Sequence, residues 1–84
     1  MSQDRERALG KFVILKKQIY ELSIKAQSMV NVIHEETDSF LSDKDFNSMD
    51  FVKIETLAKE LQLIQEDYTV KAGHMQHIKE TYGF

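Results

Sequence analysis

Residues 12–33 of the sequence, FVILKKQIYELSIKAQSMVNVI, carry apolar side chains at alternating intervals of three and four positions. The members of this first seam are Phe12, Leu15, Ile19, Leu22, Ala26, Met29 and Ile33. Because an α-helix makes one turn in about 3.6 residues, this spacing places the seam in one stripe along a helix. The stretch therefore predicts a long amphipathic helix that packs against a second helix.

A second stretch with similar spacing follows downstream. Its apolar members are Ile54, Leu57, Leu61, Ile64, Tyr68, Met75, Ile78 and Tyr82. Between the two stretches, near residues 42–48, Ser, Asp and Asn side chains favour turns. A chain folded back there pairs residues whose numbers sum to about 90, such as Leu15 with Met75. The sequence predicts an all-α fold, a long antiparallel helical hairpin packed as a two-helix coiled coil.

The predicted hairpin takes up the 84 residues as a single domain. We expect the first helix over about residues 4–38, the turn over about 39–48 and the second helix over about 49–81. Proline is absent and there are three glycines, which disfavours a structure of many turns and strands. Gly83 is placed to end the second helix. Four apolar side chains are expected to pack at the closed end of the hairpin: Phe40, Leu41, Phe46 and Phe51.

Several apolar side chains lie outside the two seams and would be exposed in an isolated hairpin. They form one row with Val13, Tyr20 and Ile24, and a second row with Leu63, Val70 and, at the same spacing, His77. Leaving such a side chain in water forgoes roughly 1.5–3 kcal/mol, against a total stability of about 5–15 kcal/mol. We therefore predict that these residues form a dimer or partner interface. A homodimeric four-helix bundle is favoured, and a different helical protein would satisfy the same rows.

Charge is unevenly distributed along the chain. Residues 1–33 carry a net charge of +3, residues 34–50 a net charge of −5 and residues 51–84 a net charge of −1. Basic side chains on one helix are the kind of surface that binds phosphate groups of nucleic acids. Because the chain as a whole is acidic, at −3, we expect these side chains to be solvated helix surface instead. A nucleic-acid-binding regulator that uses the basic surface of the first helix in a dimer is the alternative function.

Two short motifs raise the question of a metal site. Residues 43–47 read DKDFN, the opening of a calcium-binding loop, but Ser48 stands where such a loop needs glycine and Ile54 where it needs glutamate. His74 and His77 are three residues apart on the second helix, with Glu80 a further three along. Two histidines at this spacing are more often helix surface than zinc ligands. We expect neither motif to bind a metal, and we expect no cofactor.

The remaining features favour a binding protein over an enzyme. The sequence shows no nucleophile–base arrangement, no glycine-rich phosphate loop and no motif that assigns it to a known family. No apolar run approaches the roughly 18 residues of a membrane span, the first residues do not resemble a signal peptide, and cysteine is absent. We expect a small non-enzymatic protein-interaction module in the cytoplasm: an adaptor, regulator or chaperone-like hairpin that acts through apolar helix faces.

Overall fold

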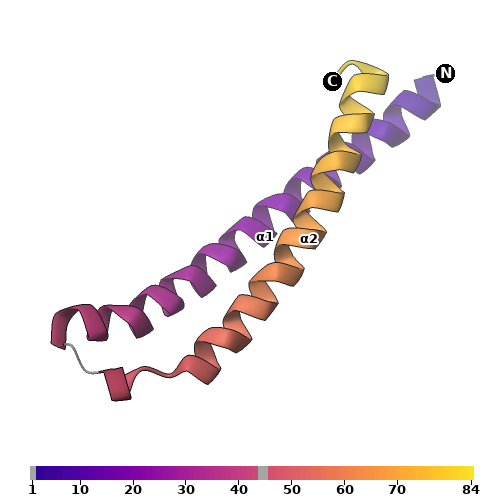
Figure 1. The fold of residues 1–84 in the computed structure, drawn as a ribbon. Helices are drawn as coiled ribbons and strands as arrows, with labels where there is room; N and C mark the ends of the chain where they lie inside the picture. The colour runs from indigo at the N-terminus through magenta and orange to yellow at the C-terminus, as the bar shows by residue number, and fades with distance from the viewer. Residues whose placement is uncertain (1, 44–45) are drawn as a thin grey trace.

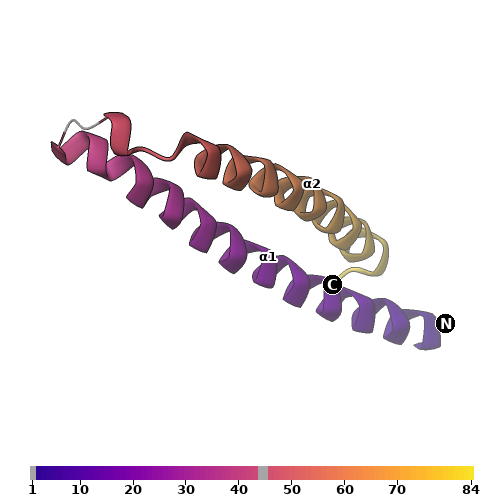
Figure 2. The ribbon, with the colours of Figure 1, turned by 90° about the horizontal axis from the view of Figure 1, so that it is seen from below.

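The structure, a computed structural model, describes residues 2–43 and 46–84. Helix α1 spans Ser2–Asp43, the short 3-10 helix η1 spans Phe46–Ser48, and helix α2 spans Phe51–Tyr82. The two long helices run antiparallel, and both ends of the chain lie at the same end of the molecule (Figures 1 and 2). The described residues contain no strand. The predicted all-α helical hairpin is confirmed.

The hairpin is a rod that measures 63 × 17 × 15 Å. We call the part with residues 2–20 and 71–84 the open end, and the part with residues 34–43 and 46–56 the closed end. A polar contact joins the helices at each end. The Arg5 guanidinium donates a hydrogen bond of 2.9 Å to the carbonyl of Tyr82, and Lys53 Nζ lies 2.9 Å from Glu36 Oε1. In both pairs the residue numbers sum to nearly 90, as the predicted pairing requires.

Helix α1 ends later than the sequence predicts. Acidic groups such as Glu35, Glu36 and Asp38 are unfavourable at the negative end of a helix, yet α1 continues past the predicted end at about residue 38 to Asp43. Contacts with the rest of the molecule offset that effect. Lys53 pairs with Glu36, and this hydrogen bond and charge raise the pKa of the Lys53 ammonium. The Phe40 ring contacts Phe46 of η1 at 5.9 Å between ring centroids.

Helix α2 is capped at both ends by local hydrogen bonds. Its N-cap is Asp50, whose carboxylate accepts a 2.9 Å hydrogen bond from the backbone N–H of Lys53. The helix thus begins at Phe51, slightly after the predicted start at about residue 49. At the other end Gly83 adopts the left-handed conformation, with φ of 71°, and its N–H donates to the carbonyl of Lys79 at 2.8 Å. Glycine reaches this conformation without steric cost, so the predicted stop is confirmed.

Asp50→Ala should lower the free energy of unfolding by about 1 kcal/mol, within a range of roughly 0.5–2 kcal/mol, because it removes the acceptor for an otherwise unpaired helix N–H. Urea denaturation followed by circular dichroism measures this change. Asn47→Ala is the matched control, since Asn47 is exposed in η1 and surface substitutions away from such features stay within about 0.5 kcal/mol. Equal effects of the two substitutions would contradict the assignment of Asp50 as the cap.

The core of the hairpin is small and most of it lies toward the open end. Among the residues that the structure describes, the buried apolar side chains are Ala8, Leu15, Met29 and Ile78. Around Ala8, Leu15 and Ile78 the partly buried side chains of Phe12, Met75, Tyr82 and Phe84 complete a cluster. At the closed end, Phe46 contacts both Phe40 and Phe51, with ring centroids 5.9 and 5.2 Å apart. The three phenylalanines thus pack at the closed end as predicted. The prediction was wrong for Leu41, which is exposed.

Candidate interaction surface

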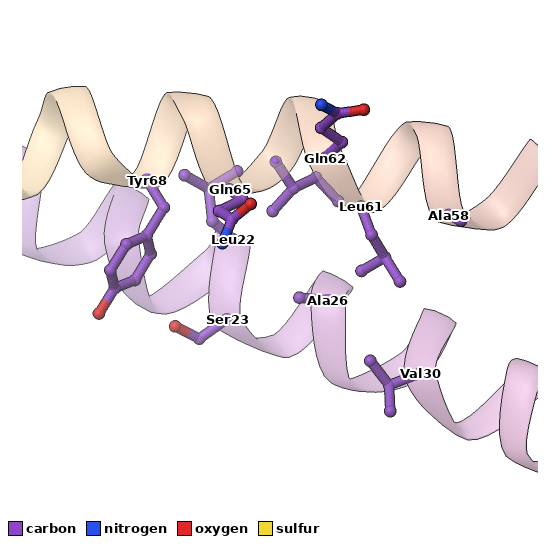
Figure 3. Close-up of a pocket in the computed structure, with 10 residues that line it drawn as sticks. Leu22, Ser23, Ala26, Val30, Ala58, Leu61, Gln62, Gln65 and Tyr68 are labelled. Carbon is purple, nitrogen blue, oxygen red and sulfur yellow. The ribbon is translucent and has the colours of Figure 1, made fainter.

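A groove lies along the middle of the hairpin, between α1 and α2 (Figure 3). It has a volume of about 670 Å³. Leu61 projects from α2 toward α1, and the Tyr68 side chain extends from α2 across α1 (Figure 3). The lining is apolar with a few neutral polar groups: Leu22, Ser23, Ala26, Val30, Ala58, Leu61, Gln62, Ile64, Gln65 and Tyr68. No charged side chain lines this groove.

The groove exists because the seam is incompletely filled in its middle. The sequence predicts continuous packing there, with Ala26 opposite Ile64 and Leu22 opposite Tyr68. In the structure Leu22 and Ile64 are only half-buried, and Tyr68 is 41% exposed. Ala26 and Ala58, which both line the groove, are too short to fill the space between the helices. An apolar part of the seam is therefore open to solvent from one side.

The other side of the seam is charged. A smaller hollow of about 290 Å³ is lined there by Gln18, Glu21, Leu22, Lys25, Asp67 and Lys71. Lys71 Nζ lies 2.6 Å from Asp67 Oδ1 across one turn of α2. Leu22 is the residue common to both hollows, as expected for a seam residue with one hollow on each side. We call the two sides of the hairpin the groove side and the charged side.

The interface residues predicted from the sequence fall on different sides. Tyr20 precedes the groove residue Ser23 by three positions, so it lies on the groove side. Val13 precedes Tyr20 by seven positions, two helical turns, and therefore lies on the same side. Leu63 precedes Asp67 by four positions, so it lies on the charged side with Val70, which is three positions after Asp67. The structure does not bring the two rows together.

All of the predicted interface residues are nevertheless uncovered. The apolar members are 50–70% exposed, and His77 is also exposed. The set comprises Val13, Tyr20, Ile24, Leu63, Val70 and His77. Their role as an interface stays a prediction, and the hairpin by itself leaves them in contact with water.

The interface set predicted from the sequence leaves out three exposed apolar residues on the groove side of α1. Leu9 and Val30 are about half-exposed, and both lie in one heptad row with Ser23, at separations of fourteen and seven residues. Leu41 follows Val30 by eleven residues, three helical turns, and is exposed on the same side. We call this set the outer row of α1: Leu9, Val13, Tyr20, Val30 and Leu41. The seven-residue spacing from Ser23 was the signal that could have identified Leu9 and Val30.

The histidine motif does not assemble a metal site. His74 and His77 are exposed, and Glu80 Oε1 accepts a 3.0 Å hydrogen bond from Gln76. Over residues 2–43 and 46–84, no group of three His, Asp or Glu side chains is placed to hold an ion. The calcium-like motif falls on Lys44 and Asp45 and on the side chain of Asp43, which lie outside the described residues.

Calcium or zinc at about tenfold molar excess should leave the melting temperature unchanged, because an ion that bound the folded state alone would raise it by mass action. Differential scanning calorimetry with and without each ion measures this. An upward shift with calcium that Asp43→Ala abolishes would show that the turn binds calcium. A shift with zinc that His74→Ala abolishes would do the same for the histidine motif.

The hairpin exposes more surface than a compact protein of its mass. It exposes 6540 Å² at 9.8 kDa, whereas a folded monomer of that mass exposes about 5,200 Å². The excess is roughly 1,300 Å². Two packed helices have little interior, so much of each helix faces solvent.

Over the residues that the structure describes, neither α1 nor α2 holds an apolar segment long enough to cross a membrane. Comparison with models of protein families, with curated proteins and with solved structures finds no match to this chain.

Proposed function

We propose that the protein is a small non-enzymatic protein-interaction module, an adaptor, regulator or chaperone-like hairpin, that acts through its uncovered apolar helix faces. The proposal includes self-association of two hairpins into a four-helix bundle. The main support for this proposal is that the groove in the middle of the seam leaves apolar side chains of both helices accessible to solvent. A further helix laid on the groove would complete the packing that the two helices begin.

The size of the core supports this proposal. Among the described residues, four apolar side chains are buried; the three large ones, Leu15, Met29 and Ile78, contribute roughly 1.5–3 kcal/mol each and Ala8 contributes less. Single cores of this size rarely supply more than about 3–5 kcal/mol of net stability. The excess exposed area of roughly 1,300 Å² is larger than the roughly 800 Å² that each partner buries in a standard interface. An additional helical partner would therefore stabilise the hairpin substantially.

The polar groups of the groove suit a binding surface. Ser23, Gln62, Gln65 and the Tyr68 hydroxyl are neutral and surround an apolar floor, which is the arrangement of an apolar interface centre with a polar rim. General acid–base chemistry needs titratable groups poised close together, and the groove offers none beyond the phenol of Tyr68. A cytoplasmic location belongs to the proposal, and a sequence without cysteine is compatible with a reducing compartment.

Sedimentation equilibrium tests the self-association. At micromolar concentration we expect a mass of about twice the 9.8 kDa of one chain. The melting temperature should rise with protein concentration, because association stabilises the folded state. A mass of one chain up to the highest soluble concentration, with a melting temperature that does not change, would overturn the dimer.

The alternative function, nucleic-acid binding, has one observation in its favour. The open end carries seven basic and three acidic side chains. Against it, the Arg5 guanidinium is already engaged with the carbonyl of Tyr82 and lies 5.1 Å from the centre of the Phe84 ring. Titration of RNA and DNA with the protein at several salt concentrations distinguishes the two functions. We expect no saturable binding, whereas an affinity that falls steeply with salt would support phosphate contacts.

A further inference from the structure

We propose that a second copy of this chain covers the groove side and lies antiparallel to the first, so that the open end of each hairpin is beside the closed end of the other. This inference rests on the proposed self-association and adds the side of contact and the orientation. In this arrangement a two-fold axis crosses the long axis of the hairpins near the groove, α1 packs on α1 of the partner copy, and α2 packs on α2.

The distribution of charge decides the orientation. The open end has a net charge of +4, and the closed end, counted over residues 34–43 and 46–56, has six acidic side chains against Lys53 and a net charge of −5. If the two closed ends lay together, like charges would meet at both ends of the bundle. In the antiparallel arrangement each acidic end lies beside a basic end. Neighbouring helices lie about 8–10 Å apart, which is comparable to the screening length in physiological salt. The electrostatic preference for the antiparallel arrangement therefore persists in physiological salt.

Four of the five members of the outer row of α1 are arranged symmetrically about a point near residue 25. A two-fold axis at that point places Leu9 beside Leu41 of the partner copy, since these two residues are equally far from it. In the same way it places Tyr20 beside the partner's Val30. All four side chains are exposed in the single hairpin. The α1 residues that line the groove run from Leu22 to Val30, so the centre of the groove nearly coincides with the centre of the row.

The absence of charge in the groove decides the side. Its lining contains no ionised side chain, so a partner copy that covers the groove removes no charge from water in the middle of the contact. A contact on the charged side would bury Glu21, Lys25, Asp67 and Lys71, which line the hollow there, and burying ion pairs is unfavourable unless every charge is paired. Leu63, Val70 and His77 are then outside the contact between copies. The sequence had suggested one interface for both rows, and the groove side alone holds Val13 and Tyr20.

Cysteine cross-linking tests the orientation, and the chain has no cysteine of its own. Gln3→Cys places a thiol at the open end and Asn47→Cys places one at the closed end, both at exposed positions. With a bismaleimide cross-linker, we expect a covalent dimer when the two variants are mixed and allowed to exchange, and little when either is used alone. Efficient cross-linking of each variant with itself would show a parallel dimer and overturn the orientation, although self-association would stand.

A matched pair of serine substitutions tests the side of contact. Ser23 lines the groove close to the expected axis, whereas Ser28 follows Glu21 by seven residues and is exposed on the charged side. Ser23→Cys should cross-link with itself at least tenfold more than Ser28→Cys does. The reverse order would overturn the groove as the contact between copies. A sedimentation mass of one chain for the unmodified protein would instead overturn the proposed self-association, and the orientation with it.

Discussion

Ile78→Ala should lower the free energy of unfolding by about 2–5 kcal/mol, the cost of removing a large aliphatic side chain from a packed site. Ile78 is 5% exposed, the least of the buried apolar residues, and it packs in the cluster with Ala8 and Leu15. Partly buried side chains of Phe12, Met75, Tyr82 and Phe84 surround this cluster, so the truncation leaves a space within packed side chains. Each 1 kcal/mol should lower the melting temperature by roughly 4–8 °C in a domain of this size.

Two exposed charged residues provide the control for this prediction. Lys17→Ala and Glu66→Ala replace exposed side chains of α1 and α2, and each should change the free energy of unfolding by less than about 0.5 kcal/mol. All variants are compared at one protein concentration, because association would make the melting temperature depend on concentration. A cost for Ile78→Ala no larger than that of the controls would contradict the packing at the open end.

Val30→Asp should dissociate the dimer at concentrations where the unmodified protein is associated. In the single hairpin Val30 is 51% exposed, so an aspartate there is solvated and the hairpin tolerates it. In the proposed dimer the same position lies beside Tyr20 of the partner copy, where a carboxylate would be buried without a counter-charge. An unpaired buried charge costs about 3–5 kcal/mol. Because the dimer is two-fold symmetric, it would contain two such charges. Sedimentation equilibrium should give the mass of one chain.

Val70→Asp is the matched control, with the same change of side chain on the other helix. Val70 is 70% exposed and lies on the charged side, three residues after Asp67. If the copies meet across the groove, this variant should remain dimeric. If Val70→Asp dissociated the dimer and Val30→Asp did not, the contact between copies would lie on the charged side. Leu63 and His77 would then be part of that contact.

The sequence by itself determined the hairpin, because its governing interactions are local or strictly periodic. Apolar residues at intervals of three and four define the direction in which each helix must pack, and two such helices joined by a polar turn have one pairing. The contacts of Lys53 with Glu36 and of Arg5 with Tyr82 agree with that pairing. Gly83 could be recognised as a helix stop because a left-handed residue favours glycine whatever surrounds it.

The end of α1 and the depth of packing were decided by the tertiary structure. Local electrostatics suggested a stop near Asp38, and contacts with η1 and α2 extend the helix to Asp43. Periodicity gives the direction of a side chain and not the volume available to it. The spacing of Leu22 and Ala26 therefore could not show that the seam stays open between them and α2, because that depends on the volumes of side chains from both helices at once.

Only the tertiary structure decided which exposed rows share a side. When each helix is considered alone, the row that contains Tyr20 and the row that contains Leu63 look alike, because both consist of apolar residues outside a seam. Antiparallel packing sets Ser23 of α1 beside Gln62 and Gln65 of α2 on the groove side, and Glu21 beside Asp67 on the charged side. Rows that both lie off the seam are thereby separated by the full thickness of the hairpin. Their relation depends on how the two helices face each other, which no single helical pattern contains.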